Sequence, residues 1–455
     1  VLYLSLWIYL TMNNNDNEYQ YRDIIDLYYT KISIGIDGVS ISVILIITLI
    51  FPIIMLLKDR EINNKTSTKN IANILLFMES ILILIFISLD ILFFFIMFEL
   101  ILIPMFIIIG KYGSRVNKIE AAYRFLIYTM IGSLVMLISI LIIYLKYGTT
   151  NIEIINYKLL DILYFNTTNI FLIQILWVFI FFSFMIKIPM FPFHTWLPEA
   201  HTEAPTIGSI ILAAILLKLG TFGIYRYSFS LFNLDGNISN IYNYFLPLIY
   251  ILSILSIFYG SFIAIRSIDL KKIIAYSSIV HMNFSIFGFF SQDLMGLSGT
   301  SFLMFSHAFV SSSLFLLIGI LYKRYHSRII SYYKGLVLTM PLFSSFFLFF
   351  SLANISLPFT SSFISEIFIL ISSFKLNFFI SILLTSSLIF SSSYVIFLAN
   401  RILFGNLSSS ISHFLDLSFT EFLALFTMFL LTLLFGLYPK PLLDLFSLNL
   451  INILY

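Results

Sequence analysis

Four ionisable side chains of this 455-residue sequence lie inside long apolar runs. Glu99 lies near the middle of ILFFFIMFELILIPMFIIIG and Lys218 near the middle of GSIILAAILLKLGTFGIYR, while Lys187 and Glu366 lie in two further apolar stretches. A charge at the centre of a bilayer costs roughly 2.5–3.5 kcal/mol on insertion scales, so such a group is expected to face a partner or water. Burial makes a lysine release its proton more readily, and a nearby carboxylate opposes this. The pattern predicts proton transfer that begins with a Glu99–Lys187 contact of variable strength.

Histidines extend this set of candidates. His281 and His307 lie between Lys218 and Glu366 in the sequence, in adjacent apolar runs. Imidazole titrates near neutral pH and can relay protons with water and serine. His194 and His201 flank a proline-rich segment and are candidate accessory groups.

Each candidate also has a purely structural interpretation. Glu99 could be a protonated packing residue, and Lys187 could extend its amine towards the membrane surface from a helix end. Glu366 could be a carboxylate stabilised at a helix N-terminus. Any of the histidines could be a neutral, hydrogen-bonded core residue.

The composition indicates which elements must position these groups. The chain is 60% hydrophobic and 10% charged, with a mean hydropathy of +1.02, which is typical of an integral membrane protein. It has no cysteine, which excludes thiolate-bound iron–sulfur clusters and cysteine zinc sites. It lacks Gly-rich nucleotide-binding motifs, and its net charge of +3 is spread over several loops, which argues against nucleic-acid binding.

We expect an all-α, polytopic transmembrane bundle. A spanning helix needs about 20 apolar residues, which suggests about 13 spans. Residues 1–38 are expected to form a reduced N-terminal segment, 39–438 the transmembrane helical domain and 439–455 a C-terminal tail. The single spans are predicted at 39–57, 71–89, 91–110, 121–146, 207–226, 243–265, 273–290, 300–322, 377–400 and 420–438.

Two apolar stretches, 170–197 and 341–374, are too long for one straight span and are predicted to be interrupted helices. Pro189 and Pro192 follow Lys187 closely, and Pro358 precedes Glu366. Proline removes a backbone donor and clashes with the preceding turn, so it explains such breaks. Two broken helices in corresponding halves indicate a transport site and internal inverted repeats.

Loop charges predict the orientation. Sixteen Lys and Arg residues lie in the loops of one side, in 58–70, 111–124, 266–272, 323–334 and at 401, against seven on the other side, among them Arg226. The positive-inside rule places the basic loops in the matrix or cytoplasm.

The run MIKIPMFPFHTWLPEAHTEAPTIGSIILAAILLKLGTFGIYR (185–226) resembles the most characteristic segment of the subunit-4 family of antiporter-like subunits of respiratory NADH:ubiquinone oxidoreductase, complex I. GIDGVSI, AAYRFLIYTMIGSLVML, MFSHAFVSSSLF and FGLYPKPLLD also resemble family segments, in family order, over residues 35–445. One departure concerns the second break. The family usually has L-P-G-T followed by Gly-Glu, where this chain has LPFT and Ser365-Glu366.

The resemblance implies a proton path along the membrane midplane through Glu99, Lys187, Lys218, His281, His307 and Glu366. It implies a mitochondrial inner-membrane subunit of the respiratory chain that binds no cofactor itself. Flavin, iron–sulfur clusters and ubiquinone are expected on partner subunits. Other membrane-arm subunits, including neighbouring antiporter-like subunits, and lipids are the expected partners. The alternative is a subunit of a multi-subunit cation/proton antiporter of related fold.

Overall fold

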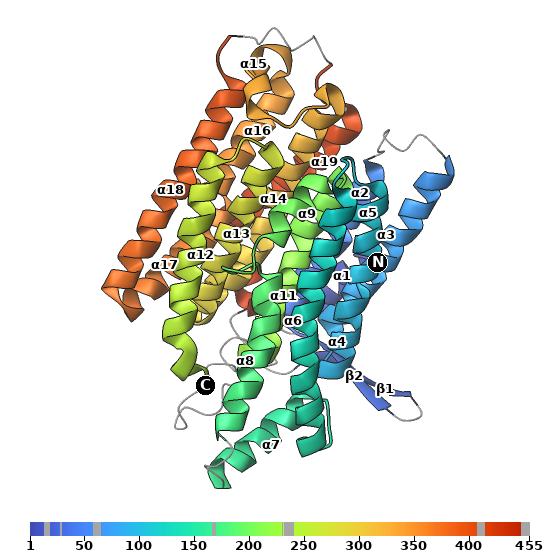
Figure 1. The fold of residues 1–455 in the computed structure, drawn as a ribbon, viewed down its shortest axis with the longest axis vertical. Coiled ribbons are helices and arrows are strands. Elements are labelled where there is room, and N and C mark those ends of the chain that lie inside the picture. The colour runs from blue at the N-terminus through green and yellow to red at the C-terminus, as the bar shows by residue number, and fades with distance from the viewer. Residues whose placement is uncertain are drawn as a thin grey trace.

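The computed structural model shows an elongated bundle of helices (Figure 1). It describes residues 1–12, 19–27, 30–57, 65–165, 170–229, 231, 241–406 and 415–446. Most helices run along the long axis of the molecule. The short helix α15 (Leu336–Thr339) lies at one end, and α7 (Ile152–Phe165) and a β-hairpin lie at the other. We call these the basic end and the hairpin end.

The helical fold class is confirmed, and every predicted single span coincides with a helix. These helices are α2 (Gly38–Leu56), α3 (Lys65–Ile87), α4 (Ile91–Leu100) with α5 (Leu102–Tyr112), α6 (Lys118–Tyr147), the segment Thr206–Phe229, α12 (Leu246–Arg266), α13 (Leu270–Phe289), α14 (Leu294–Tyr325), α18 (Phe378–Leu403) and α19 (Phe419–Leu437). Within the described residues, nine helices are long and apolar enough to cross a membrane, and α13 is long enough but more polar.

The two long apolar stretches each contain two helices. The first consists of α8 (Ile170–Lys187) and α9 (Trp196–Glu203), and the second of α16 (Pro341–Asn354) and α17 (Ser361–Leu376). Pro189 and Pro192 lie between α8 and α9, and Pro358 lies between α16 and α17. The shorter helices are α1 (Leu2–Thr11), η4 (Ile241–Phe245) and η5 (Ile330–Tyr332).

The expectation of a purely α-helical chain missed a two-stranded antiparallel hairpin, β1 (Gln20–Leu27) and β2 (Thr30–Ile36). Apolar and polar residues alternate in KISIGI, which is the period of a strand. Ile34 of β2 forms an antiparallel bridge with Ser88, directly after α3. The hairpin is therefore joined to the junction between two spans.

The segment Thr206–Phe229 departs from regular α-helix on both sides of Lys218. It consists of α10 (Thr206–Ile211), the π-helix η2 (Leu212–Leu216), α11 (Leu217–Gly223) and the π-helix η3 (Ile224–Phe229). Wide turns of this kind are rare and occur frequently at functional sites.

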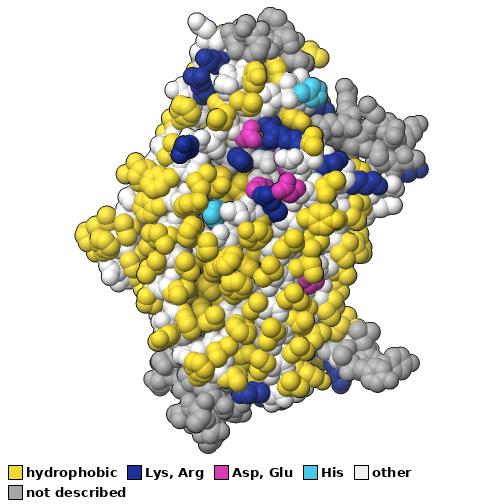
Figure 2. All heavy atoms as spheres, viewed as in Figure 1, with side chains coloured by type: hydrophobic (Ala, Val, Ile, Leu, Met, Phe, Trp, Pro, Cys, Tyr) yellow, Lys and Arg dark blue, Asp and Glu magenta, His cyan; other side chains and the backbone are white. Residues whose placement is uncertain are grey.

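Burial differs strongly between helices. The most apolar window of α14 is 100% buried, whereas that of α19 is 28% buried. Hydrophobic side chains cover the middle of the molecular surface, and most of the charged side chains in view gather towards the basic end (Figure 2). An apolar belt of this kind suits contact with lipid, and α14 lies in the protein core.

Candidate functional site

Lys218 and His307 are in direct contact in the centre of the bundle. Nζ of Lys218 donates to the carbonyl oxygen of Ala213 at 2.7 Å and lies 2.9 Å from Nδ1 of His307. Lys218 is fully buried and His307 is 4% exposed. Ala213 belongs to the π-helix η2, so the irregular turn supplies one of the two partners of the amine. One proton can be shared between the amine and the imidazole.

A second pair, His281 and Glu366, continues from His307. The two histidine rings lie 5.6 Å apart between their centroids. Nδ1 of His281 lies 3.2 Å from Oε1 of Glu366, which is an ion-pair distance without the alignment of a hydrogen bond. Nε2 of His281 lies 3.1 Å from Oδ1 of Asn354. Residues from α11, α14, α13 and α17 thus form a row of neighbouring side chains, with no hydrogen bond between the two histidines.

Sequence reasoning missed Asn354. It is the last residue of α16, at the break of the second interrupted helix. Its Oδ1 lies within hydrogen-bond distance of Nε2 of His281, the ring nitrogen that faces away from Glu366. No local pattern in the sequence singles it out, because its partner His281 lies 73 residues away along the chain.

Lys187 and Glu99 lie close together but form no direct ion pair. The amine of Lys187 donates to the carbonyl oxygen of Phe98 at 3.2 Å and lies 2.9 Å from the centroid of the Phe98 ring. The Glu99 carboxylate is near enough to interact electrostatically with this amine. Its Oε1 is buried without a hydrogen-bond partner among the described residues. The two groups are therefore neighbours in the core without sharing a hydrogen bond.

The two accessory histidines are also buried. The ring of His201 stacks on Phe315 at 4.4 Å, and neither ring nitrogen has a hydrogen-bond partner among the described residues. The ring of His194 packs edge-on against Tyr259 at 4.9 Å. Neither histidine contacts the Lys218–Glu366 row through a described hydrogen bond.

The row can carry protons but offers no metal site. Within the described ranges, no group of three or more His, Cys, Asp or Glu side chains could hold a metal ion. Amine, imidazole and carboxylate groups in contact form an arrangement in which a proton can pass between neighbours.

Comparisons with known proteins identify the family of the chain. A family model described as NADH:quinone oxidoreductase/Mrp antiporter, transmembrane, matches residues 88–392, which is more than half of the chain. NADH-ubiquinone oxidoreductase chain 4 of Chondrus crispus is 45% identical, covering 99% of this chain and 89% of its own length. The Arabidopsis thaliana protein of that name is 44% identical, covering 97% and 86%.

Solved structures share the fold over the whole chain. A chain of respiratory complex I from Thermus thermophilus matches with a TM-score of 0.85 and 26% identity, covering 100% of this chain and 93% of that one. A chain of the Mrp complex from Dietzia has a TM-score of 0.85 at 16% identity, with 99% and 90% covered, and supports the fold alone. The chain therefore belongs to the transmembrane family of NADH:quinone oxidoreductase and Mrp antiporter subunits, within the group of NADH-ubiquinone oxidoreductase chain 4.

Proposed function

We propose that this chain is a proton-translocating membrane subunit of NADH:ubiquinone oxidoreductase, and that its protons move along the row from Lys218 to Glu366. The observation that carries the proposal is the contact between Lys218 and His307, at 2.9 Å in the core of the bundle. An amine and an imidazole in contact in a water-poor interior exchange one proton between them.

The steps balance in protons. Protonated Lys218 gives a proton to Nδ1 of His307 and becomes a neutral amine. Nε2 of His307 is buried and has no hydrogen-bond partner in the described part of the chain, so it is the atom that can pass a proton towards His281. His281 then protonates the carboxylate of Glu366 across 3.2 Å. Glu366 releases the proton at the end of the cycle.

Lys187 supplies the charge that starts each cycle. Its amine rests on the Phe98 ring and on one carbonyl oxygen, with Glu99 nearby. A change in the Glu99–Lys187 separation alters how tightly Lys187 holds its proton. Lys187 and Lys218 share no described hydrogen bond, so water is needed between them.

Redox chemistry belongs to other subunits of the assembly. The chain has no cysteine for an iron–sulfur cluster. Flavin, iron–sulfur clusters and ubiquinone reside on partner subunits, and neighbouring membrane-arm subunits flank this chain in the mitochondrial inner membrane. Lipid covers its remaining apolar surface.

Replacing Lys218 with methionine tests the proposal. Methionine preserves the length of the side chain and removes its titrating group, so redox-driven proton pumping should fall sharply while NADH oxidation by the artificial acceptor ferricyanide is unchanged. The measurement is acidification by the purified assembly in proteoliposomes, per NADH oxidised. Lys146→Met, at an exposed position at the end of α6, is the control and should pump normally. Normal pumping by an assembled Lys218→Met variant would reject the proposal.

A cation/proton antiporter subunit is the alternative, because the matching family model includes Mrp antiporters. The two functions predict different proteins and activities that co-purify with the chain. Purification from native membranes with NADH-oxidising activity supports complex I, and purification with sodium/proton exchange and no NADH oxidation supports the antiporter.

A further inference from the structure

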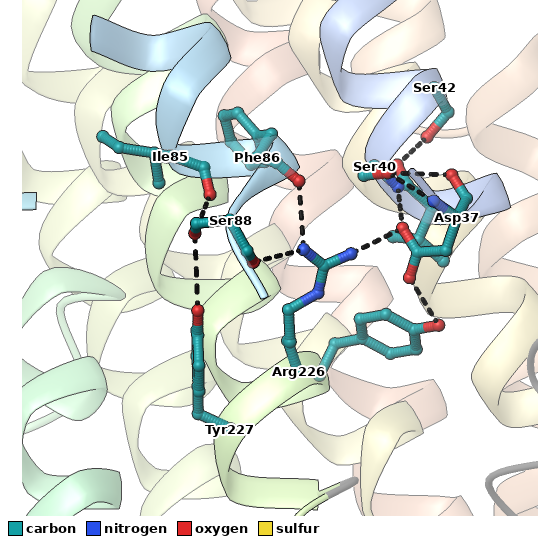
Figure 3. Close-up of polar contacts among 10 residues, drawn as sticks. Asp37, Ser40, Ser42, Ile85, Phe86, Ser88, Arg226 and Tyr227 are labelled. Carbon is teal, nitrogen blue, oxygen red and sulfur yellow. Dashed lines mark hydrogen bonds and ion pairs between the residues drawn. The ribbon is translucent and has the colours of Figure 1, made fainter. Parts of the chain in front are cut away.

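A second buried charged cluster lies on the segment that carries Lys218, at the hairpin end of the bundle (Figure 3). Its centre is Arg226 in η3, about two helical turns beyond Lys218. The sequence suggested that Arg226 is a loop charge that sets orientation. The structure corrects this, because the side chain is fully buried.

The Arg226 guanidinium joins three separate segments. Nη2 lies 2.8 Å from Oδ1 of Asp37, at the start of α2. Nη1 donates to the carbonyl oxygens of Phe86 at 3.0 Å and Ser88 at 2.9 Å. These carbonyls lie at the C-terminal end of α3, where helix carbonyls lack partners of their own. One side chain in η3 thus links the start of α2 to the end of α3 through polar contacts.

Asp37 is fixed on its other sides as well. Its Oδ1 accepts from the backbone N–H of Ser40 at 2.8 Å and so caps α2. Its Oδ2 accepts from the hydroxyl of Tyr225 at 3.3 Å. The carboxylate is bonded by a cap, a phenol and a guanidinium and has little freedom to turn away.

Aromatic rings enclose the guanidinium on two faces. Its central carbon lies 4.5 Å from the centroid of Phe222 and 5.4 Å from that of Tyr19. Tyr19 immediately precedes the hairpin, and burial raises the pKa of its hydroxyl to about 12, so the phenol remains neutral. The cluster is packed with side chains, with a buried ion pair at its centre.

Such an arrangement opposes proton movement for two reasons. A guanidinium does not lose its proton in proteins, so it is a poor carrier. Its donors are also engaged by Asp37 and by the carbonyl oxygens of Phe86 and Ser88, so they are not free to pass protons on. Lys218, in contrast, has to exchange protons in the middle of the same segment.

We propose that the Asp37–Arg226 pair is a barrier that closes the hairpin end of the Lys218 segment to protons. Protons that reach Lys218 then leave through His307 and not directly towards the membrane surface at the hairpin end. The inference rests on the proposed function and adds to it a residue that prevents leakage. Arg226 acts through its partners and is a positioning residue.

The experiment measures passive leak separately from pumping. The full assembly is reconstituted in proteoliposomes, a pH gradient is imposed without NADH, and its decay is followed. Arg226→Gln removes the charge, and the decay should become severalfold faster. Arg124→Gln is the matched control, because Arg124 forms ion pairs with Glu120 and Glu199 on the surface. Its leak should equal that of the wild type.

A double variant tests whether the leak passes through Lys218. Adding Lys218→Met to Arg226→Gln should return the leak to the wild-type rate. A fast leak that persists in the double variant would overturn the proposal, because it would reflect general damage. An unchanged leak in Arg226→Gln alone would also overturn it.

If Arg226→Gln does not assemble, Arg226→Lys decides the question. Lysine keeps the charge but can lose its proton, so the leak should increase as the pH is raised. A leak equal to wild type at every pH would overturn the barrier. These measurements of passive leak need no NADH. A failure of the barrier proposal is therefore distinguishable from a failure of the proposed function, which is tested by the NADH-driven pumping of the Lys218→Met single variant.

Discussion

At the scale of single residues, the row depends on contacts made from four helices. His281 is held between Glu366 at 3.2 Å and Asn354 at 3.1 Å. The acceptor oxygen of Asn354 faces Nε2 of His281, which leaves Nδ1 as the nitrogen that faces Glu366 and can carry a proton to it. The neutral partner is as important to the row as the charged groups.

Replacing Asn354 with leucine should reduce pumping severalfold and shift its pH dependence. Leucine fills similar space but leaves Nε2 of His281 without its partner, a loss of about 1–3 kcal/mol for a buried polar group. The measurement is protons pumped per NADH across a range of pH. Ser351→Ala, one turn earlier in α16, removes only a hydroxyl that bonds within its own helix and should leave the profile unchanged. If the Asn354→Leu and Ser351→Ala variants had the same pH profile of pumping, this result would contradict the role given to Asn354.

The charged candidates of the row could be selected from the sequence because charge inside an apolar run is costly and therefore conspicuous. Asn354 and the partners of Arg226 could not be named in this way. An asparagine near a helix break and an arginine near a loop are both unremarkable in sequence. Their importance comes from contacts between segments far apart along the chain, which apolar periodicity does not encode.

At the scale of elements, the second break contains strained backbone. Phe359 has φ of 74° and Ser356 has φ of 65°, in the left-handed region that favours glycine. Phe359 occupies the position at which the family motif has glycine. A Cβ on Gly436 of α19 would collide with the carbonyl oxygen of Phe359, so the break is packed closely against that helix. The chain therefore has left-handed backbone at the break in a residue that is not glycine.

Substituting Phe359 with glycine should stabilise the chain by about 1 kcal/mol, because a non-glycine residue in left-handed backbone costs roughly that amount. Phe359 is 68% exposed, so few buried contacts are lost. The measurement is the temperature at which the purified assembly loses its activity. Leu357→Gly, two residues earlier and without left-handed backbone, is the control and should not raise this temperature. If the Phe359→Gly assembly lost its activity at the same temperature as the wild type or at a lower one, this result would contradict the claim that the backbone at Phe359 is strained.

At the scale of the whole molecule, the belt of apolar side chains and the basic end define how the chain lies in the membrane (Figure 2). The positive-inside rule places the basic end in the matrix. The helix α6 runs from one end to the other, with Ile119 exposed near its start and Lys146 exposed near its end. These two positions report on opposite sides of the membrane.

Single-cysteine labelling tests this orientation, and the absence of native cysteine makes the chain suitable for it. In mitochondria with ruptured outer membranes, Lys146→Cys should react with a membrane-impermeant maleimide. Ile119→Cys should react only after the inner membrane is made permeable. The opposite pattern would reverse the assignment of the two ends.

The enclosure of α14 has a consequence for how the chain is made. This helix carries His307, and its most apolar window is completely buried. It contacts α16, α17 and α19, all of which follow it in the chain. During synthesis it therefore enters the bilayer before these neighbours exist, and its hydropathy of 1.9 allows it to reside in lipid for that interval. The face of α14 that meets α16, α17 and α19 is thus exposed to hydrocarbon first, whereas His307 can pack at once against Lys218 and His281, which precede it in the chain.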